Sequence, residues 1–585
     1  MTSTVETQGL IEAKVAAEVL SPGAGQDVTP PMTRRRGVLT GIGFVFVVAC
    51  LYSMWDIGVN PLTFWSERQD IFNLLDRMWV PRIEEPRLVW EAAIDTFLMA
   101  FAGTALGIFL AIPVAFLSAN NVTTNRFVRG TARAFIVVTR ALPELILALI
   151  FVRVYSIGVL PGVLALGLHS IGMLGKLFSD SIEQIDPGPR EGVVSSGAGR
   201  FQEITTGILP QVIPSFIAIS LYRLDINFRA STLLGLVGAG GIGLQIRAHQ
   251  GSLDYEQLLG VTLVIIVLIA IVEIVSSKVR AVILGHDRSS PKGKGLAGSS
   301  RLLHRAKAAD FAPDPKAPAA VVFDRDRLVP PWSRDRIIMW TFSSVCLLML
   351  VLAFTIPDMS FLELVRGLPE IPQTFDRLIP RNMDWWQSRW GDLLIETVQM
   401  GFAATGLSLI FAIPTALLAA RNVAPARWVY NASRAFILGV RALPDLIVAV
   451  IFVAALGLGP QPGVLALAIG LYGFSTKLFA DSIEEIKEGP RDGVRSTGAT
   501  GIQETVTSVL PQAMPALVGH SLYVLDVSLR ASTVLGIVGA GGIGFPLVQG
   551  TRLFQFDLVG GLLICIFVLV YAIELLSTWV RKQVI

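Results

Sequence analysis

Long apolar segments recur along the whole chain and are separated by polar stretches. In the first half they lie near residues 37–55, 94–119, 131–156, 159–178, 208–236 and 258–281, and in the second half near 337–356, 393–420, 434–457, 462–479, 509–537 and 558–580. A helix needs about 17–25 predominantly apolar residues to cross a bilayer. The pattern therefore predicts an all-α, polytopic membrane protein with about 12 transmembrane helices.

The composition agrees with a membrane location. Hydrophobic residues make up 52% of the 585 positions and charged residues 16%, with a mean hydropathy of +0.61, whereas an ordinary soluble domain is about 25% charged. The net charge of +3 is too small to indicate a nucleic-acid partner. Cys50, Cys346 and Cys565 each lie alone in an apolar run, without the spacing of a metal site or a disulfide framework.

The two halves of the chain are copies of one another. The segment TRALPELILALIFV at 139–152 returns as VRALPDLIVAVIFV at 440–453, GKLFSDSIEQI at 175–185 returns as TKLFADSIEEI at 476–486, and RASTLLGLVGAGGIG at 229–243 returns as RASTVLGIVGAGGIG at 530–544. All three matches have the same offset of 301 residues, which a chance similarity would not keep. About six spans per half start both copies on the same side, so they are parallel repeats related by an axis along the membrane normal.

Composition divides the chain into four parts. Residues 1–33 are polar, lack the features of a signal peptide and are expected to form a disordered cytoplasmic tail. The first repeat is expected at 34–284 and the second at 337–585, joined by a cytoplasmic linker at 285–336 that is rich in Pro, Ala, Gly, Ser and charge. The basic run at 34–36 before the first span places the N-terminus in the cytoplasm, and the C-terminus is expected on the same side.

One polar segment between the fourth and fifth spans of each copy predicts a short helix. Pro189 can open this helix, Gly197 allows a bend or a close approach, and Pro210 starts the next membrane helix. Glu191 is expected in the first helical turn, where a carboxylate favours the positive end of the helix dipole and can also face a basic partner; Asp492 is its counterpart. The segments read GPREGVVSSGAGRFQEITTGILPQVIP (188–214) and GPRDGVRSTGATGIQETVTSVLPQAMP (489–515).

These two segments resemble the EAA loop of ABC-importer permeases, in which an acidic residue, a glycine six positions later and a following Leu-Pro define the coupling helix. The resemblance implies that each helix docks in a groove of a cytoplasmic ATPase. Gly192 and Val193, and Gly493 and Val494, stand where the alanines of the loop would be, and the second copy has Asp for Glu. An ordinary amphipathic interfacial helix is the alternative. The matching positions are Glu191, Gly197, Leu209 and Pro210 in the first copy and Asp492, Gly498, Leu510 and Pro511 in the second.

Further motifs narrow the resemblance to the phosphonate-importer permeases, and it covers nearly all of each half. It implies import of phosphonate or a related phosphorus oxyanion (phosphate, phosphite or phosphate esters) across the bacterial plasma membrane. It also implies that one copy of this chain works in the lipid bilayer with two copies of a cytoplasmic ABC ATPase and one extracellular or periplasmic substrate-binding protein. The motifs are RALPEL, GMLGKLFSDSIEQID, GILPQVIP, LYRLDINFRAST and LGLVGAGGIG.

The sequence has no phosphate-binding loop of the pattern GxxxxGK(S/T), so the chain is expected to be no enzyme and to bind no cofactor, while ATP and Mg bind to the partner subunits. GxGxxG at 238–243 and 539–544 ends an apolar segment instead of following a soluble strand, so it predicts a tight re-entrant turn or close helix packing.

Two other functions stay open: an autonomous ion-coupled secondary transporter, and an ABC permease for an unrelated small solute such as methionine.

Ionisable residues inside the predicted spans are costly and are candidates for function. In the third span of each copy, two charges four residues apart can neutralise each other on one helix face, or expose an arginine to the pathway, and a proline between them should kink the helix. Similar pairs in the fourth span are expected to be structural. The pairs are Arg140 with Glu144 and Arg441 with Asp445, then Lys176 with Asp180 and Lys477 with Asp481.

Arginines before the glycine-rich stretch are the strongest pathway candidates. An anionic phosphonate needs guanidinium groups or backbone N–H donors. We therefore expect Arg229 with Ser231, and Arg530 with Ser532, to line the pathway. The channel is also expected to be asymmetric, because the copies differ inside the spans. The differing pairs are Arg153 and Ala454, His169 and Gly470, and Arg223 and Val524.

Overall fold

The computed structural model describes residues 34–59, 61–284, 334–355, 359, 361–381, 386 and 388–584. This part of the chain is helical, and none of its residues lies in a strand. The predicted all-α membrane fold is therefore confirmed. The expected tail at 1–33 and nearly all of the expected linker at 285–336 lie outside the described residues.

Among the described residues, eight unbroken helices are long and apolar enough to cross a membrane. They form two equivalent sets of four, at the positions that the apolar segments predict. In the first copy they are α4 (Pro86–Ser118), α7 (Val159–Glu183), α10 (Leu209–Leu234) and α12 (Tyr255–Leu284), and in the second copy α17 (Ser388–Ala419), α20 (Pro460–Glu484), α23 (Leu510–Leu535) and α25 (Phe556–Val584).

The third predicted span of each copy is broken into two helices. In the first copy α5 (Arg126–Ala141) meets α6 (Glu144–Tyr155) at a bend of 88°, and in the second α18 (Arg427–Arg441) meets α19 (Asp445–Leu456) at 76°. A proline cannot donate to the preceding turn, and it drives the residue before it out of the α region. Leu142 precedes the proline and is accordingly extended, with φ −87° and ψ 118°. The predicted kink is thus a full break, and the described residues hold up to ten spans if each bent pair is one.

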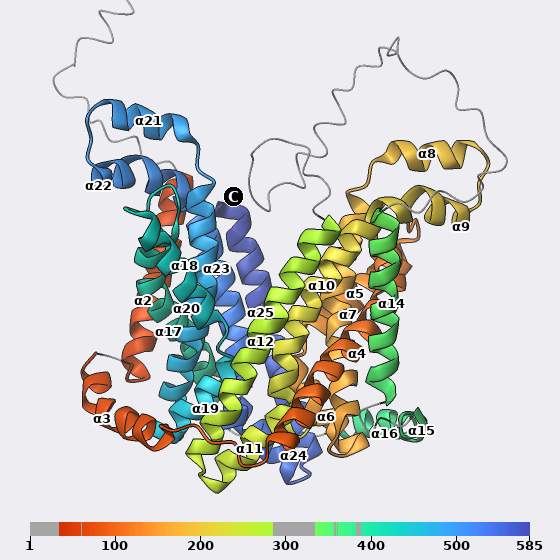
Figure 1. The fold of residues 1–585 in the computed structure, drawn as a ribbon, viewed down its shortest axis with the longest axis horizontal. Coiled ribbons are helices and arrows are strands. Elements are labelled where there is room, and N and C mark those ends of the chain that lie inside the picture. Colours follow the sequence, from red (N-terminus) through yellow and green to blue (C-terminus); the bar gives the residue numbers. More distant parts are fainter. Residues whose placement is uncertain are drawn as a thin grey trace, which may run out of the picture.

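The first helix of each copy packs against the other copy. The helix α2 (Arg34–Asp56) lies along α17, and α14 (Arg334–Thr355) lies along α4 (Figure 1). They are 23 and 22 residues long, but their apolar parts, Gly41–Asp56 and Ser344–Ala353, are shorter than the eight spans above. Buried Cys50 of α2 fits against Gly406 of α17, where an added Cβ would come within 2.8 Å of the cysteine Cβ. The two sequence repeats are therefore interlocked by an exchange of their first helices.

Short helices lie at both ends of the bundle (Figure 1). Two of them, α8 (Pro187–Ser195) and α21 (Glu488–Ser496), project from one end, where α25 also ends. The opposite end is called the distal end below. The helices there are α3 (Pro61–Met78), α11 (Ile242–Ser252), α15 (Phe361–Gly367), α16 (Glu370–Arg377) and α24 (Gly544–Arg552).

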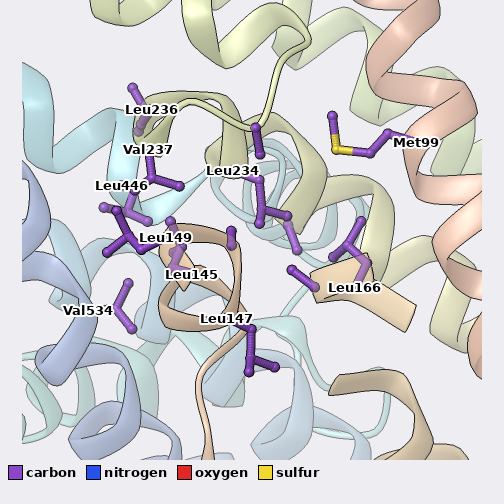
Figure 2. Close-up of a cluster of buried hydrophobic side chains, with 14 of the residues drawn as sticks. Met99, Leu145, Leu147, Leu149, Leu166, Leu234, Leu236, Val237, Leu446 and Val534 are labelled. Atoms are coloured by element: carbon purple, nitrogen blue, oxygen red, sulfur yellow. The ribbon is translucent and has the colours of Figure 1, made fainter. Parts of the chain in front are cut away.

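One buried apolar cluster joins the two copies, between α6 and α19 toward the distal end (Figure 2). Close packing of side chains from both copies excludes water from this part of the interface. We call six of its residues the apolar seal. They are Leu145, Leu149, Leu236 and Val237 of the first copy, with Leu446 and Val534 of the second.

Candidate functional site

Two equivalent units project from the end opposite the distal end (Figure 1). The first projecting unit comprises α8, α9 (Arg200–Gln202) and a π-helical turn, Glu203–Ile208, that runs directly into α10. The second comprises α21, α22 (Gly501–Glu504) and the π-helical turn Thr505–Val509, which runs into α23. The short helix predicted before the fifth span thus forms in both copies.

Gly197 and Gly498 follow α8 and α21 in the left-handed conformation. Their φ angles are +81° and +80°, a conformation that costs an ordinary L-residue about 1–2 kcal/mol. The Gly197 N–H donates to the Val194 carbonyl at 3.0 Å and closes the end of α8. An added Cβ on either glycine would meet nothing within 4 Å. The sequence predicts that Gly197 allows either a bend of the chain or a close approach of another group. The structure shows the bend, because no other group of the described residues packs against this glycine.

Glu191 and Asp492 lie on exposed faces of the projecting units. Each is the fifth residue of its helix, because α8 and α21 begin four residues earlier, so the predicted position in the first turn is wrong. In α8 the Asp186 carboxylate caps the helix by accepting a hydrogen bond from the Gly188 N–H at 2.9 Å. Asp186, and not Glu191, is therefore the carboxylate at the positive end of the helix dipole. The described residues form no ion pair with Glu191 or Asp492. Both carboxylates are therefore open to a partner.

A buried ion pair holds each projecting unit together. Arg190 of α8 donates from Nε to Glu203 Oε1 at 2.6 Å, and Arg491 pairs with Glu504 in the same way. The two glutamates are 9% and 5% exposed. The backbones also approach closely, because an added Cβ on Gly207 would lie 3.1 Å from Arg190 Cα. The sequence reasoning missed this pair, although an arginine and a glutamate thirteen positions apart recur in both copies.

Leu209–Pro210 and Leu510–Pro511 stand at the start of the fifth membrane helices. The helix α10 begins at Leu209 and α23 at Leu510, each with its proline in the first turn. The chain is already helical before them, however, because the π-helical turns run on into both helices. A proline lacks the N–H that would bond to the preceding turn, and in both copies it lies directly after a π-helical turn inside a continuous helix.

Each projecting unit also exposes one large apolar side chain at an equivalent position. Phe201 of α9 is 78% exposed and Ile502 of α22 is 79% exposed. A single exposed apolar residue is ordinary on a protein surface. The same exposure in both copies, beside an open carboxylate and outside the apolar bundle, indicates a contact surface for another protein.

The arginines of the fifth span are paired with carboxylates one turn earlier. Arg229 Nη2 donates to Asp225 Oδ2 at 2.9 Å, and Arg530 pairs with Asp526 in the second copy. Both carboxylates are buried, whereas the Arg229 side chain is 28% exposed. This pairing removes the cost of an isolated charge in an apolar span.

The two serines predicted beside these arginines are buried in the described conformation. Ser231 and Ser532 are both 0% exposed. The Ser231 hydroxyl donates to the Phe228 carbonyl at 2.8 Å, and the Ser532 hydroxyl donates to the Thr397 carbonyl of α17 at 2.9 Å. Their polar groups are used within the helix bundle, because a buried hydroxyl must find a partner there.

Glu273 of α12 connects the two copies through arginines. Its Oε2 lies 4.0 Å from Arg229 Nη2, and its Oε1 lies 3.7 Å from Arg441 Nη1 of α18. The side chains of Glu273 and Arg441 are each 18% exposed. We call Asp225, Arg229, Glu273 and Arg441 the central charge cluster. Glu273 was not among the residues predicted from the sequence, although a glutamate inside an apolar span is a sign of a functional residue.

The predicted neutralising pairs of the third span are wrong in both copies. The break before α6 puts Arg140 and Glu144 on different helices, and Glu144 Oε2 instead lies 3.0 Å from His169 Nε2. In the second copy Arg441 pairs with Glu273, as described above. Asp445 Oδ1 there occupies the space of the missing histidine, since an added Cβ on Gly470 would collide with it.

The fourth-span pairs differ between the copies. Lys176 Nζ donates to Asp180 Oδ1 at 2.6 Å. In the second copy Asp481 Oδ1 instead accepts from Arg434 Nη1 of α18 at 2.8 Å, beside exposed Lys477. These residues lie near the projecting end of α7 and α20, and Lys477 is close enough to Arg441 and Glu273 of the central charge cluster to interact with them electrostatically.

The glycine-rich stretch forms a tight turn between α10 and α11. Gly238, Gly240 and Gly241 have φ angles of +101°, +75° and +70°, and the second copy repeats them. The turn is tied to α4, because the Ile242 N–H donates to Thr96 Oγ1 at 2.8 Å. The stretch follows a membrane helix, in agreement with the predicted turn, and it does not form a strand–turn–helix nucleotide site.

The chain matches one protein family twice. Residues 103–283 and 412–585 match the family described as "Binding-protein-dependent transport system inner membrane component". The chain is 43% identical to the phosphate-import permease protein PhnE of Mycolicibacterium smegmatis over 537 residues, which are 92% of this chain and 93% of that protein. It is 36% identical over 262 residues to the phosphite transport system permease protein PtxC of Stutzerimonas stutzeri, covering 43% of this chain and 95% of that protein. An inward-facing structure of the MetNI methionine ABC transporter aligns at 24% identity with a TM-score of 0.31, over 34% of this chain and 96% of its own.

Proposed function

The chain belongs to the family of binding-protein-dependent transport system inner membrane components, and we propose that it is the permease of an ATP-driven importer for phosphorus oxyanions. The substrate is phosphonate or a related anion: phosphate, phosphite or a phosphate ester. The two relatives described above are a phosphate-import and a phosphite-transport permease. These anions share a tetrahedral phosphorus centre with charged oxygens, so one kind of site can serve the whole class.

The doubled projecting unit is the observation that carries this proposal. Each unit presents an open carboxylate, Glu191 or Asp492, and an exposed apolar side chain, Phe201 or Ile502. Two such surfaces in one chain fit two ATPase subunits, so one copy of this chain supplies the whole membrane part of the importer. ATP and Mg²⁺ then bind to the ATPases, and this chain binds no cofactor.

The orientation follows from where the ATPases dock. The projecting end and both termini lie on the cytoplasmic side of the bacterial plasma membrane. The distal end faces outward, where one substrate-binding protein delivers the anion. The apolar seal closes the interface on that side, so the described conformation blocks passage from outside.

Substrate recognition inside the membrane is assigned to the central charge cluster. Arg229 and Arg441 come from different copies and share the Glu273 carboxylate. An oxyanion that enters between the copies competes with Glu273 for the two guanidinium groups. Arg140 and Arg530 stay candidates for the same pathway. Binding here should be weak, because a passage that holds its substrate tightly releases it slowly.

Transport is driven by a movement of the two halves against each other. When ATP draws the ATPases together, each rigid projecting unit transmits the motion to α10 or α23, because the helices are continuous with the π-helical turns. The exchanged helices α2 and α14 make each moving half a composite of both copies. The seal opens outward, and the ion pairs of Glu273 change partners.

Reconstitution into proteoliposomes tests the function. The chain is combined with its ATPases and binding protein, and uptake of radiolabelled phosphate and methylphosphonate is measured with ATP, without ATP, and with a proton or sodium gradient alone. Uptake should require ATP and all partners. Uptake driven by a gradient alone would identify a secondary transporter, and ATP-driven methionine uptake without phosphorus uptake would identify the other alternative.

A further inference from the structure

A cavity of about 480 Å³ lies between the two copies at the distal end. Its walls come from the end of α6, from α11 and α24, and from the short turns Gly235–Val237 and Gly536–Val538. Equivalent residues of both copies line it, because Leu236 corresponds to Ile537 and Arg247 corresponds to Val548. A space lined by both members of such pairs lies on the axis between the copies, where a single pathway must run.

Three arginines, Arg153, Arg247 and Arg552, line this cavity. Arg153 is held in place, because its Nη2 donates to the Thr551 carbonyl and its Cζ lies 4.1 Å from the ring centre of Phe554. Arg247 and Arg552 are exposed. Loss of hydration in the cavity wall, and next the positive charge of Arg552, lower the pKa of the Arg247 guanidinium from its ordinary value.

The cavity has no carboxylate in its lining, and the described residues form no ion pair with these three arginines. A neighbouring cavity is lined by four carboxylates and one arginine, namely Glu91, Asp95, Glu363 and Glu370 with Arg366. The basic character is therefore specific to the cavity on the axis. Guanidinium groups that crowd a wet cavity without a counter-charge raise the local concentration of anions.

Each of the three arginines occurs in one copy only. The equivalent positions carry Ala454 for Arg153, Val548 for Arg247 and Gly251 for Arg552. Two copies of the first half would place four arginines around the axis, and two copies of the second half would place two. The fusion of two diverged copies in one chain allows a single site with three.

The cavity lies directly beyond the apolar seal. Leu236 and Val237 belong to the seal and also line the cavity. Arg229 of the central charge cluster precedes Leu236 by about two helical turns, or about 10 Å along the helix axis. The interface between the copies therefore has arginines at two levels, with an apolar barrier between them. Those of the central charge cluster are paired with carboxylates, whereas those of the cavity are not.

We propose that Arg153, Arg247 and Arg552 form an anion-receiving site on the distal side of the seal. The site holds a phosphorus oxyanion after the binding protein releases it and until the seal opens toward Arg229 and Arg441. This inference rests on the proposed function. Guanidinium groups suit the task because each can donate two parallel N–H bonds to a phosphoryl group.

The test uses the complete transporter in proteoliposomes, with its ATPases and binding protein, and inorganic phosphate and methylphosphonate as probes. Arg247→Gln with Arg552→Gln should lower uptake about tenfold, because charge-assisted hydrogen bonds to the anion are lost. Arg247→Lys with Arg552→Lys should retain part of the uptake. The matched control, Arg82→Gln with Arg381→Gln, removes the same charge from distal loops outside the cavity and should change uptake by less than about twofold.

Assembly with the ATPases and association with the binding protein are measured for every variant. Unchanged uptake by an assembled cavity variant would overturn the site. A loss of binding-protein association that accounts for the lost uptake would also overturn it, and would assign the arginines to a docking surface. If the wild-type transporter carries neither probe, the proposed function fails before any variant is compared.

Discussion

Glu273 of α12 lies 3.7 Å from Arg441 of α18, so an ion pair joins the two copies inside the membrane. The same carboxylate lies 4.0 Å from Arg229 of its own copy. A carboxylate shared by arginines of both copies must exchange contacts whenever the copies move against each other. A movement of the two copies against each other would therefore change the contacts of the central charge cluster.

A double-mutant cycle measures this link. Glu273→Gln and Arg441→Gln should each destabilise the purified protein, because each removes the partly buried ion pair between the copies. The double variant should lose less stability than the two single variants lose together, and the difference, the coupling energy, should be about 0.5–3 kcal/mol. Unfolding in detergent micelles gives the four stabilities. The exposed pair Arg87–Glu91 is the control and should show little coupling; strict additivity at Glu273 and Arg441 would contradict the ion pair.

The buried pair of Arg190 and Glu203 separates folding of the projecting unit from docking. Arg190→Ala leaves the Glu203 carboxylate buried without its partner and should weaken the unit by about 1–3 kcal/mol. Faster hydrogen exchange across residues 187–208 is the measurement. Glu191→Ala is the control, because this exposed side chain should leave exchange unchanged and weaken only the association with the ATPase. Equal exchange in both variants would refute the structural role of the pair.

The sequence predicts those parts of the fold that depend on single helices and on the order of segments along the chain. Apolar segments and a constant offset were enough to predict the spans and the duplication, because both are properties of single helices and of the chain order. The exchange of α2 and α14 between the copies could not be predicted in this way. The sequence pattern of an apolar helix is the same whichever copy the helix packs against. Its partner is set only by packing, as between Cys50 and Gly406.

The candidate site shows the same limit. The rule that residues four apart share a helix face holds in unbroken α10, where Arg229 meets Asp225. The rule fails across the proline break, where Glu144 contacts His169 instead of Arg140. The contacts of Glu273 with the second copy could not be predicted from spacing at all, because they depend on how the two copies are placed.

The left-handed glycines give a prediction that depends on backbone alone. Gly197→Ala together with Gly498→Ala should weaken ATPase association, because each alanine costs about 1–2 kcal/mol in the left-handed conformation although nothing crowds its side chain. Asparagine, which tolerates this conformation, should be milder. Co-purification of the ATPase measures the effect. Gly130→Ala in α5, another uncrowded position but with an ordinary φ, is the control; an equal effect there would exclude backbone strain as the cause.

The exposed apolar residues of the projecting units should carry much of the docking energy. Phe201→Ser together with Ile502→Ser should leave the fold intact, because both side chains are nearly fully exposed. Burying such a side chain against a partner is worth about 1.5–3 kcal/mol, so each single variant should weaken ATPase binding about tenfold or more and the pair should abolish transport. Phe127→Ser, which is 82% exposed on α5 outside the units, is the control. Unchanged binding by the double variant would mean that the ATPases dock elsewhere, and the assignment of the projecting units would fail with it.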